Sequence, residues 1–221
     1  MKPDLRMEAL PPEQAWLKPG LHVVPVGSDL VLLDLQADEY LCLPDCHGLE
    51  VLGNLVRGPI EALLRLSAEE LITGANPRPE ARRGPPPLPV TGLPAAPTVR
   101  PRLRDVLEFA TIWIDVVRSR PTIGRLASRM GGRRGRKDDV AAIAARVEVF
   151  RQLLPLAPWT GACLLQAELL LRFLNAADLD ADWVFGVRLW PFLAHCWLQI
   201  DDLCVSESPD TLASYHPILV L

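Results

Sequence analysis

Two residues in the C-terminal half of the sequence have the chemistry of a nucleophile and its base. Cys163 opens an apolar stretch, residues 164–174, whose spacing predicts a buried helix. A cysteine in the first turn of a helix is favoured as the thiolate, because the helix dipole and the free N–H groups stabilise negative charge. His195 follows in a strand-like run, and an imidazole beside such a sulfur can take its proton. The pair predicts nucleophilic catalysis by a cysteine; the competing interpretation is a buried structural cysteine.

The predicted strand 193–200 carries the histidine. Alternate side chains of a strand share a face, so His195 and Trp197 point one way and Cys196 points the other. A single histidine on an apolar strand is more often a packed core residue. His195 is still the leading base, because the remaining three of the four histidines lie in another segment or beside the terminus: His22, His47 and His216.

The elements that must position these residues are helices first and antiparallel strands last. Helical spacing predicts helices over 102–118, 122–130 and 139–154, with Asp138 capping the last of them. Alternation and turn residues then predict strands at 183–189, 193–200, 203–205 and 217–221. This order predicts an α+β domain. The first helix carries an apolar stripe that we interpret as core rather than as a binding face: Leu103, Val106, Leu107, Ala110, Ile114 and Val117.

The N-terminal segment predicts a small module without catalytic residues. Three short strands, 21–26, 30–35 and 39–43, precede predicted short helices at 48–55 and 59–66, and a capping box at Ser67–Glu70 predicts one more helical turn. The edge of such a sheet has unpaired N–H and C=O groups that can take up an extended peptide. A plain structural subdomain is the alternative. No metal is expected at Cys42, Cys46 and His47, since a fourth ligand is missing.

Composition sets the domain boundaries and the class of protein. Many of the 22 prolines fall between residues 76 and 100, which predicts a linker between a domain at 1–75 and another at 101–221. The net charge of −4 argues against nucleic-acid binding. No uncharged run reaches the ~18 residues of a membrane span. Five cysteines without framework spacing, and no apolar N-terminal segment, predict a cytoplasmic protein with reduced thiols.

Short motifs along the sequence occur in a fixed order. The C-terminal set is Trp159, Gly161, Cys163–Leu164, Trp183–Arg188, Pro191–Phe192, Ala194–Trp197, Tyr215 and Pro217–Leu219. In their order and spacing, residues 102–221 resemble the lasso-peptide B proteins, the transglutaminase-like cysteine peptidases of lasso-peptide biosynthesis. Asp38–Tyr40 leads the third strand of the N-terminal segment. Residues 19–75 thereby resemble the PqqD-like RiPP recognition element that fused members carry, a small winged-helix-like fold of a three-stranded sheet plus short helices.

The resemblance implies a Cys-His-Asp triad. Cys163 and His195 fall on its first two positions. The third position falls in the stretch 205–209, where this chain has Glu207 in place of aspartate; Asp202 and Asp210 are the alternatives. Trp159 and Gln152 are candidates for shaping the oxyanion site, whose main donor should be the backbone N–H of Cys163.

The resemblance also implies a function. The leader of a precursor peptide would add as a strand to the edge formed by Glu39, Tyr40, Leu41, Cys42 and Leu43. The C-terminal domain would cut the leader from the core, freeing an amine that a separate asparagine-synthetase-like cyclase uses to close a macrolactam. No cofactor or metal is implied for this chain, and ATP would enter through the partner cyclase. Two alternatives stay open: a non-catalytic chaperone that delivers the precursor to the cyclase, and acyl transfer by the same triad.

Overall fold

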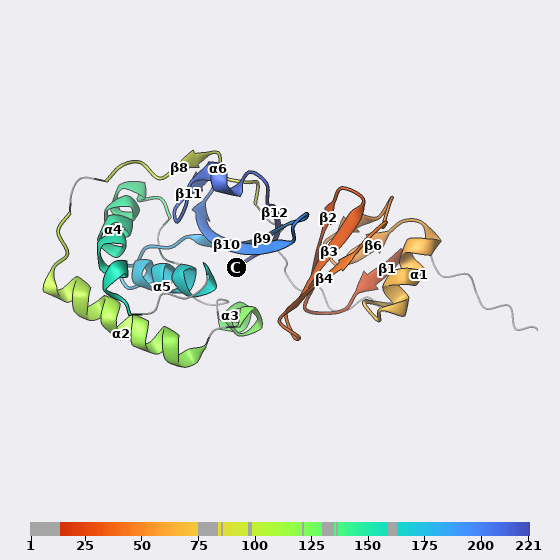
Figure 1. The fold of residues 1–221 in the computed structure, drawn as a ribbon, viewed down its shortest axis with the longest axis horizontal. Coiled ribbons are helices and arrows are strands. Elements are labelled where there is room, and N and C mark those ends of the chain that lie inside the picture. Colours follow the sequence, from red (N-terminus) through yellow and green to blue (C-terminus); the bar gives the residue numbers. More distant parts are fainter. Residues whose placement is uncertain are drawn as a thin grey trace, which may run out of the picture. The chain divides into compact units, whose positions relative to one another are not determined.

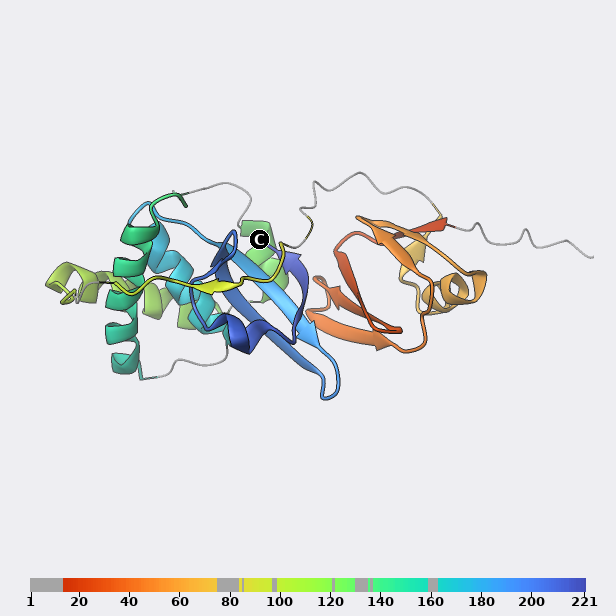
Figure 2. The same ribbon diagram turned by 90° about the horizontal axis from the view of Figure 1, so that it is seen from above.

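A computed structural model of the chain describes residues 14–74, 84, 86–96, 99–120, 122–129, 135, 137–158 and 163–221. The chain divides into two compact units, residues 1–82 and 83–221, which are described separately (Figures 1 and 2). In the described part of the chain, no helix combines the length and the apolar character that crossing a membrane requires.

The first unit contains the predicted three-stranded meander. Its strands β2 (Leu21–Val26), β3 (Asp29–Asp34) and β4 (Glu39–Leu43) pair antiparallel in that order. Gly27 makes the first turn with a φ of 63°, a conformation that glycine adopts without strain. Pro25 lies in β2, an edge of the sheet, where a missing N–H breaks no ladder. The other edge is β4, the strand that the sequence singled out as a peptide-binding edge.

A second sheet replaces part of the predicted helical structure. It runs β5 (Glu50–Leu52), β6 (Leu55–Arg57), β1 (Gln14–Leu17) and β7 (Ile72–Thr73). The helix predicted at 48–55 is wrong, because Gly53, with a φ of 65°, and Asn54 form a two-residue hairpin turn between β5 and β6. The expected extra helical turn is also wrong, since α1 (Ile60–Ala68) continues through Ser67. The winged-helix-like arrangement is not confirmed by these elements.

One apolar core joins the two sheets and the helix of the first unit. Leu30 and Leu32 enter it from β3, and Leu63 and Leu66 enter it from α1. All four are at most 2% exposed. At about 25 cal/mol per Å² of buried apolar surface, side chains of this size each stabilise the fold by roughly 1.5–3 kcal/mol. The unit therefore has its own hydrophobic core.

The second unit has the predicted α+β layout. Its helices α2 (Leu103–Ser119), α3 (Ile123–Arg129), α4 (Val140–Leu153), with the short 3-10 helix η1 (Leu154–Leu156), and α5 (Cys163–Asn175) precede most of the sheet. The sheet runs β12 (His216–Val220), β9 (Asp182–Arg188), β10 (Leu193–Ile200), β11 (Leu203–Cys204) and β8 (Thr91–Gly92), and the short α6 (Pro209–Leu212) follows β11. Helix α5 packs between strand β10 and helices α2 and α4 (Figure 1). The cap of α4 is Asp139, which accepts from the Ala142 N–H at 3.0 Å, one residue after the predicted Asp138.

Part of the expected linker belongs to this sheet. Strand β8 pairs parallel with β11, and the Leu93 N–H donates to the carbonyl of Cys204 at 3.0 Å. The buried amide of Gln199 donates to the carbonyl of Pro87 at 3.1 Å. Residues 86–96 therefore lie along β11 as an edge segment of this sheet, which we call the strap (Figure 2). The high proline content of these residues had indicated a linker instead.

The apolar stripe of α2 is not core, contrary to the sequence prediction. Leu103 is 75% exposed and Leu107 is 59% exposed, whereas Phe109 and Val116 are buried. Phe109 makes edge-on contacts with Phe150 of α4 and Phe173 of α5, with ring centroids 5.7 and 6.2 Å away. This aromatic cluster and the ion pairs of Arg146 with Asp105 and Glu108 fix the rotation of α2 about its axis. The apolar stripe of α2 therefore faces outward.

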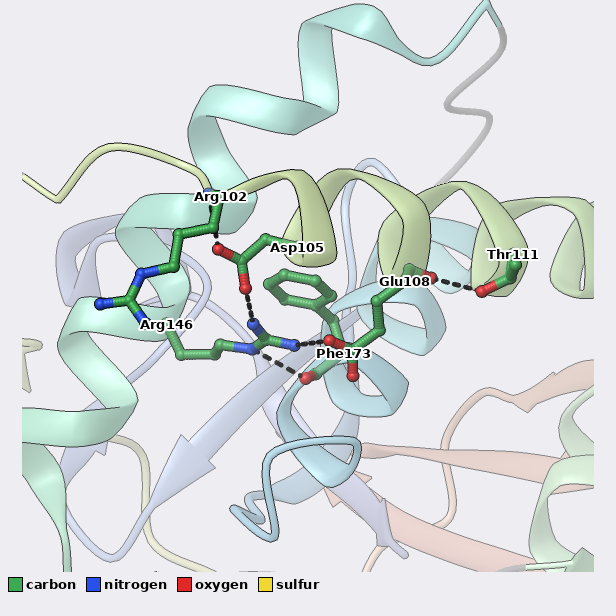
Figure 3. Close-up of polar contacts among 6 residues, drawn as sticks. All are labelled: Arg102, Asp105, Glu108, Thr111, Arg146 and Phe173. Carbon is green, nitrogen blue, oxygen red and sulfur yellow. Dashed lines mark hydrogen bonds and ion pairs between the residues drawn. The ribbon is translucent and has the colours of Figure 1, made fainter.

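Arg146 of α4 joins the three helices (Figure 3). Its guanidinium donates to Asp105 at 2.8 Å and to Glu108 at 2.9 Å, both on α2, and to the carbonyl of Phe173 on α5 at 3.1 Å. It also lies 3.4 Å from the centre of the Phe173 ring. Only 12% of the side chain is exposed, so water screens these charges weakly. Through these contacts Arg146 fixes α5, the helix that begins at Cys163, relative to α2 and α4.

We expect Arg146→Met to destabilise the second unit by about 3–5 kcal/mol, because it leaves two carboxylates without their cation in a mostly buried site. The measurement is urea unfolding followed by tryptophan fluorescence. The matched control is Arg104→Met, since Arg104 is an exposed residue of α2, for which a change within about 0.5 kcal/mol is expected. Equal effects of the two substitutions would contradict the structural role of Arg146.

Candidate active site

Helix α5 sets the position of Cys163. The sulfur belongs to the first residue of the helix, and the helix is anchored by fully buried side chains, among them Leu169, Phe173 and Leu174. Negative charge at this end of a helix is favoured by the helix dipole. Trp159 and the expected cap Thr160 lie outside the described residues.

The hairpin of β10 and β11 brings His195 and Glu207 together. Gln199 pairs with Cys204, and the Val205 N–H donates to the Leu198 carbonyl at 2.9 Å, so the chain after β11 continues beside β10. In that register Glu207 lies beside His195. The imidazole Nε2 donates to Glu207 Oε1 at 2.5 Å. Nδ1 is then the ring nitrogen left to face the sulfur.

Two aromatic rings lie beside the imidazole. The ring centroids of His195 and Tyr215 are 5.5 Å apart, and those of His195 and Trp197 are 6.4 Å apart. Trp197 is fully buried and packs over Gly186, where a Cβ atom would come within 2.7 Å of the indole. Trp197 is thus a core residue, and together with Tyr215 it restricts the orientation of the base.

A cavity of about 250 Å³ opens on the sulfur and the imidazole. Its walls come from α4, η1, α5, β10 and the segment after β11. Apolar side chains make up much of the lining, and a few polar groups lie among them, as in pockets that bind a side chain. The lining residues are Val147, Phe150, Arg151, Leu154, Cys163, Gln166, Ala167, Leu170, His195, Cys196, Ser206 and Glu207.

Hydrogen bonds in the cavity stabilise a charged pair. A side-chain hydrogen bond from Cys196 and another from His195 lower the pKa of Cys163 to about 4, against the opposing effect of burial. The bonds to Cys163 and Glu207 raise the pKa of His195 to about 9, again against burial. Between these values the sulfur is a thiolate and the ring is an imidazolium. A thiolate is the nucleophilic form of cysteine, and an imidazolium can donate a proton.

Other candidates from the sequence lie elsewhere. Gln152 does not line the cavity, whereas its neighbours Phe150 and Arg151 of α4 do. Its amide donates to the Val99 carbonyl and to Glu148 Oε1, both at 3.0 Å, so the structure does not bring Gln152 together with Cys163 and His195. Neither Asp202 nor Asp210 lines the cavity. Within the described ranges, no three His, Cys, Asp or Glu side chains are grouped to hold a metal ion.

Comparison with known proteins agrees with this layout. The transglutaminase-like superfamily matches residues 107–220, just over half of the chain. The chain belongs to the transglutaminase-like superfamily. It is also 35% identical over 48 residues to the microcin J25-processing protein McjB of Escherichia coli, which is 22% of this chain and 23% of that protein. The aligned part thus spans about a quarter of that relative. No solved structure matches the chain significantly.

The sequence analysis missed several residues of this transglutaminase-like site. Strand alternation placed Cys196 on the face away from His195, yet both line the cavity. β9 pairs with β10 at His195, but β11 pairs only with Gln199 and Ile200, so the other edge of β10 is open beside His195. Ser206 and Arg151 also line the cavity. Predicting Ser206 would have required the register of the β10–β11 hairpin, and predicting Arg151 would have required knowing which face of α4 lies toward the cavity.

Proposed function

We infer that this chain is a cysteine peptidase that removes the leader from the precursor of a lasso peptide. The observation that carries the inference is the arrangement of Cys163, His195 and Glu207 around one cavity, with the sulfur and the imidazole held as an ion pair. The transglutaminase-like family and the similarity to a microcin J25-processing protein support the substrate class. Glu207, in the position of the family's aspartate, supplies the carboxylate that orients the base.

The chemistry follows from the charges. The Cys163 thiolate attacks the carbonyl carbon of the scissile bond, and the backbone N–H of Cys163 stabilises the oxyanion. The His195 imidazolium gives its proton to the leaving nitrogen, so the core peptide departs with a free α-amino group. The leader stays as a thioester on Cys163. His195, now neutral, takes a proton from water, and the hydroxide displaces the thiolate and releases the leader as a carboxylate.

The first unit would bind the leader. Its strand β4 is an edge of the three-stranded sheet, and none of the other described strands pairs with its outer side. An extended leader adding there would satisfy main-chain groups and place side chains against Leu41, which is 39% exposed. An asparagine-synthetase-like cyclase would receive the freed amine, and any need for ATP would arise there.

A direct test is to incubate a precursor peptide with the protein and follow the mass. Two fragments whose masses sum to the precursor plus one water are the expected result. Full-length precursor that stays bound, even with cyclase and ATP added, would instead identify a carrier. Incorporation of a labelled amine in place of water would identify acyl transfer.

The activity should depend on pH through both charges. Below a pH of about 4 the sulfur is protonated and cannot attack, and above a pH of about 9 the imidazole lacks the proton that the leaving amine needs. We therefore expect kcat/KM for cleavage to be level between these limits and to fall on both sides. The measurement is a pH profile of kcat/KM at constant ionic strength. Activity restricted to alkaline pH would show that the ion pair is absent.

Leu41→Lys should weaken leader binding about tenfold, since about 1.4 kcal/mol of apolar contact is lost. Fluorescence anisotropy with a labelled leader peptide measures this change, and KM for cleavage should rise with little effect on kcat. The matched control is Leu52→Lys, because Leu52 is 58% exposed in β5, in the other sheet. If both variants bind the leader equally well, β4 is not the binding edge.

A further inference from the structure

The two edges of strand β10 are covered unequally. Strand β9 pairs with it from Leu193 to Gln199, whereas β11 pairs only with Gln199 and Ile200. On the side away from β9, no described strand therefore pairs with the first half of β10. Neither the chemistry nor the leader-binding strand β4 proposed above uses this open edge.

The main chain of Ala194 faces the open edge. The Leu198 N–H donates to Ser206 Oγ at 3.0 Å, and the Leu198 carbonyl accepts from the Val205 N–H at 2.9 Å, so both main-chain groups of Leu198 point away from β9. In an antiparallel pair these groups alternate between the two sides of a strand. The register between β9 and β10 is unbroken. The N–H and C=O of Cys196 and of the exposed Ala194 therefore point away from β9 as well.

The side chains next to this edge are apolar and exposed. Trp190 is 84% exposed, Phe192 is 45% exposed and Leu193 is 42% exposed. Residues 189–194 carry no charge. Strand edges are usually protected by charged side chains, because an unprotected edge takes up other chains. Exposed apolar side chains beside an open edge indicate a surface that binds an uncharged, extended segment.

The active site decides which segment fits this surface. Ala194 directly precedes His195 in β10, and His195 lines the cavity with Cys163. In the proposed reaction the His195 imidazolium gives its proton to the leaving nitrogen, which belongs to the first residue of the core peptide. A strand rises about 3.3 Å per residue, so the next one or two core residues reach the level of Ala194.

We propose that the open edge of β10 at Ala194 binds the first residues of the core peptide as an added strand. The Ala194 N–H and C=O hydrogen-bond the main chain of the core, and Trp190 and Leu193 contact its apolar side chains. The inference rests on the proposed function for its choice of segment. It adds a second binding site for the precursor to the leader-binding strand β4 of the first unit.

The test is fluorescence anisotropy with two labelled probes, the full-length precursor and the leader alone. The protein carries Cys163→Ala, so that the precursor stays whole. Ala194→Pro removes the outward N–H without removing a bond to β9, as Pro25 does in the edge strand β2. It should weaken binding of the precursor about tenfold, the effect of one hydrogen bond whose partner is left unpaired, and leave binding of the leader unchanged.

Gly92→Pro is the matched control at another edge of the same sheet. The N–H groups of Thr91 and Leu93 donate toward the β10–β11 hairpin at 3.1 and 3.0 Å, so the N–H of the exposed Gly92 between them points outward. A Cβ atom at Gly92 meets its nearest neighbour, Pro209, at 3.8 Å, an ordinary contact. This variant should bind both probes with unchanged affinity.

A second measurement does not depend on how a variant folds. Precursors N-methylated at the second, third or fourth core residue are bound to the Cys163→Ala protein. Strand pairing uses the N–H of every other residue, so methylation should weaken binding about tenfold either at the third residue alone or at the second and fourth. Thermal unfolding checks that Ala194→Pro is folded.

Unchanged affinity for the precursor in a folded Ala194→Pro variant would overturn the proposal, as would equal effects of methylation at all three core residues. A loss that extends to the leader alone would also overturn it, because the edge would then bind the leader. So would a dimer that Ala194→Pro dissociates, because the edge would then pair with a second copy of the chain. If the expected losses of affinity occur and the unmodified protein cleaves no precursor, the proposed function fails while the core-binding edge stands.

Discussion

Replacing Cys163 by alanine should abolish release of the core peptide and leave leader binding unchanged. The alanine has no sulfur to form the thioester, so the route through a covalent intermediate is closed, and kcat should fall by about 10⁴-fold or more. Binding should persist because β4 belongs to the first unit, which has its own core. Mass spectrometry of the precursor measures cleavage, and fluorescence anisotropy of a labelled leader measures binding.

Matched cysteine variants separate this loss from a general effect of removing a thiol. Cys204→Ala removes a fully buried thiol outside the cavity and should cleave at a rate near that of the unmodified protein. Cys163→Ser keeps an oxygen at the position, but a hydroxyl is far less acidic than a thiol, so it should be nearly as inactive as the alanine variant. Full cleavage by Cys163→Ala would end the peptidase proposal and leave a peptide carrier.

Cys163 and His195 were accessible to sequence reasoning because each depends on a local signal, whereas Glu207 was indicated by the resemblance to the lasso-peptide B proteins. Cys163 opens a helical apolar pattern, and α5 begins at that residue. His195 lies in a run of alternating residues that forms β10 with the predicted limits. The turn at Asp201–Asp202 fixes the hairpin register, and the register brings Glu207 beside His195. Such short-range patterns survive folding because the tertiary packing agrees with them.

Features set by packing between distant segments were not accessible. Residues 48–55 fit a helical pattern, yet they contribute to the strands β5 and β6. Strand β6 pairs with β1, which precedes the whole three-stranded sheet in the sequence. The rotation of α2 depends on Arg146, which lies about forty positions later, and on the aromatic cluster that Phe109 joins. The strap at 86–96 forms by pairing with the edge of β11, a strand more than a hundred positions later, so no local sequence pattern predicts it.

The second large effect is expected at Glu207. Glu207→Gln keeps the shape of the side chain but removes the charge that faces the imidazolium, and kcat for cleavage should fall by about 10³-fold or more, since an uncharged partner supports the orientation and the charge of the base poorly. The hydrogen bond and charge of Glu207 both raise the pKa of His195. Without them the alkaline limb of the kcat/KM profile should move to lower pH, which the pH profile of the variant measures.

Three other substitutions test whether this carboxylate acts through its position. Glu207→Asp retains the charge but shortens the side chain by one methylene, so the 2.5 Å contact with His195 is lost unless the backbone moves, and activity between that of the glutamate and the glutamine is expected. Asp202→Asn and Asp210→Asn should cleave normally, because neither residue lines the cavity. A loss of activity in Asp210→Asn with full activity in Glu207→Gln would show that another acid orients the imidazole, and the register of the β10–β11 hairpin would then not be what positions the base.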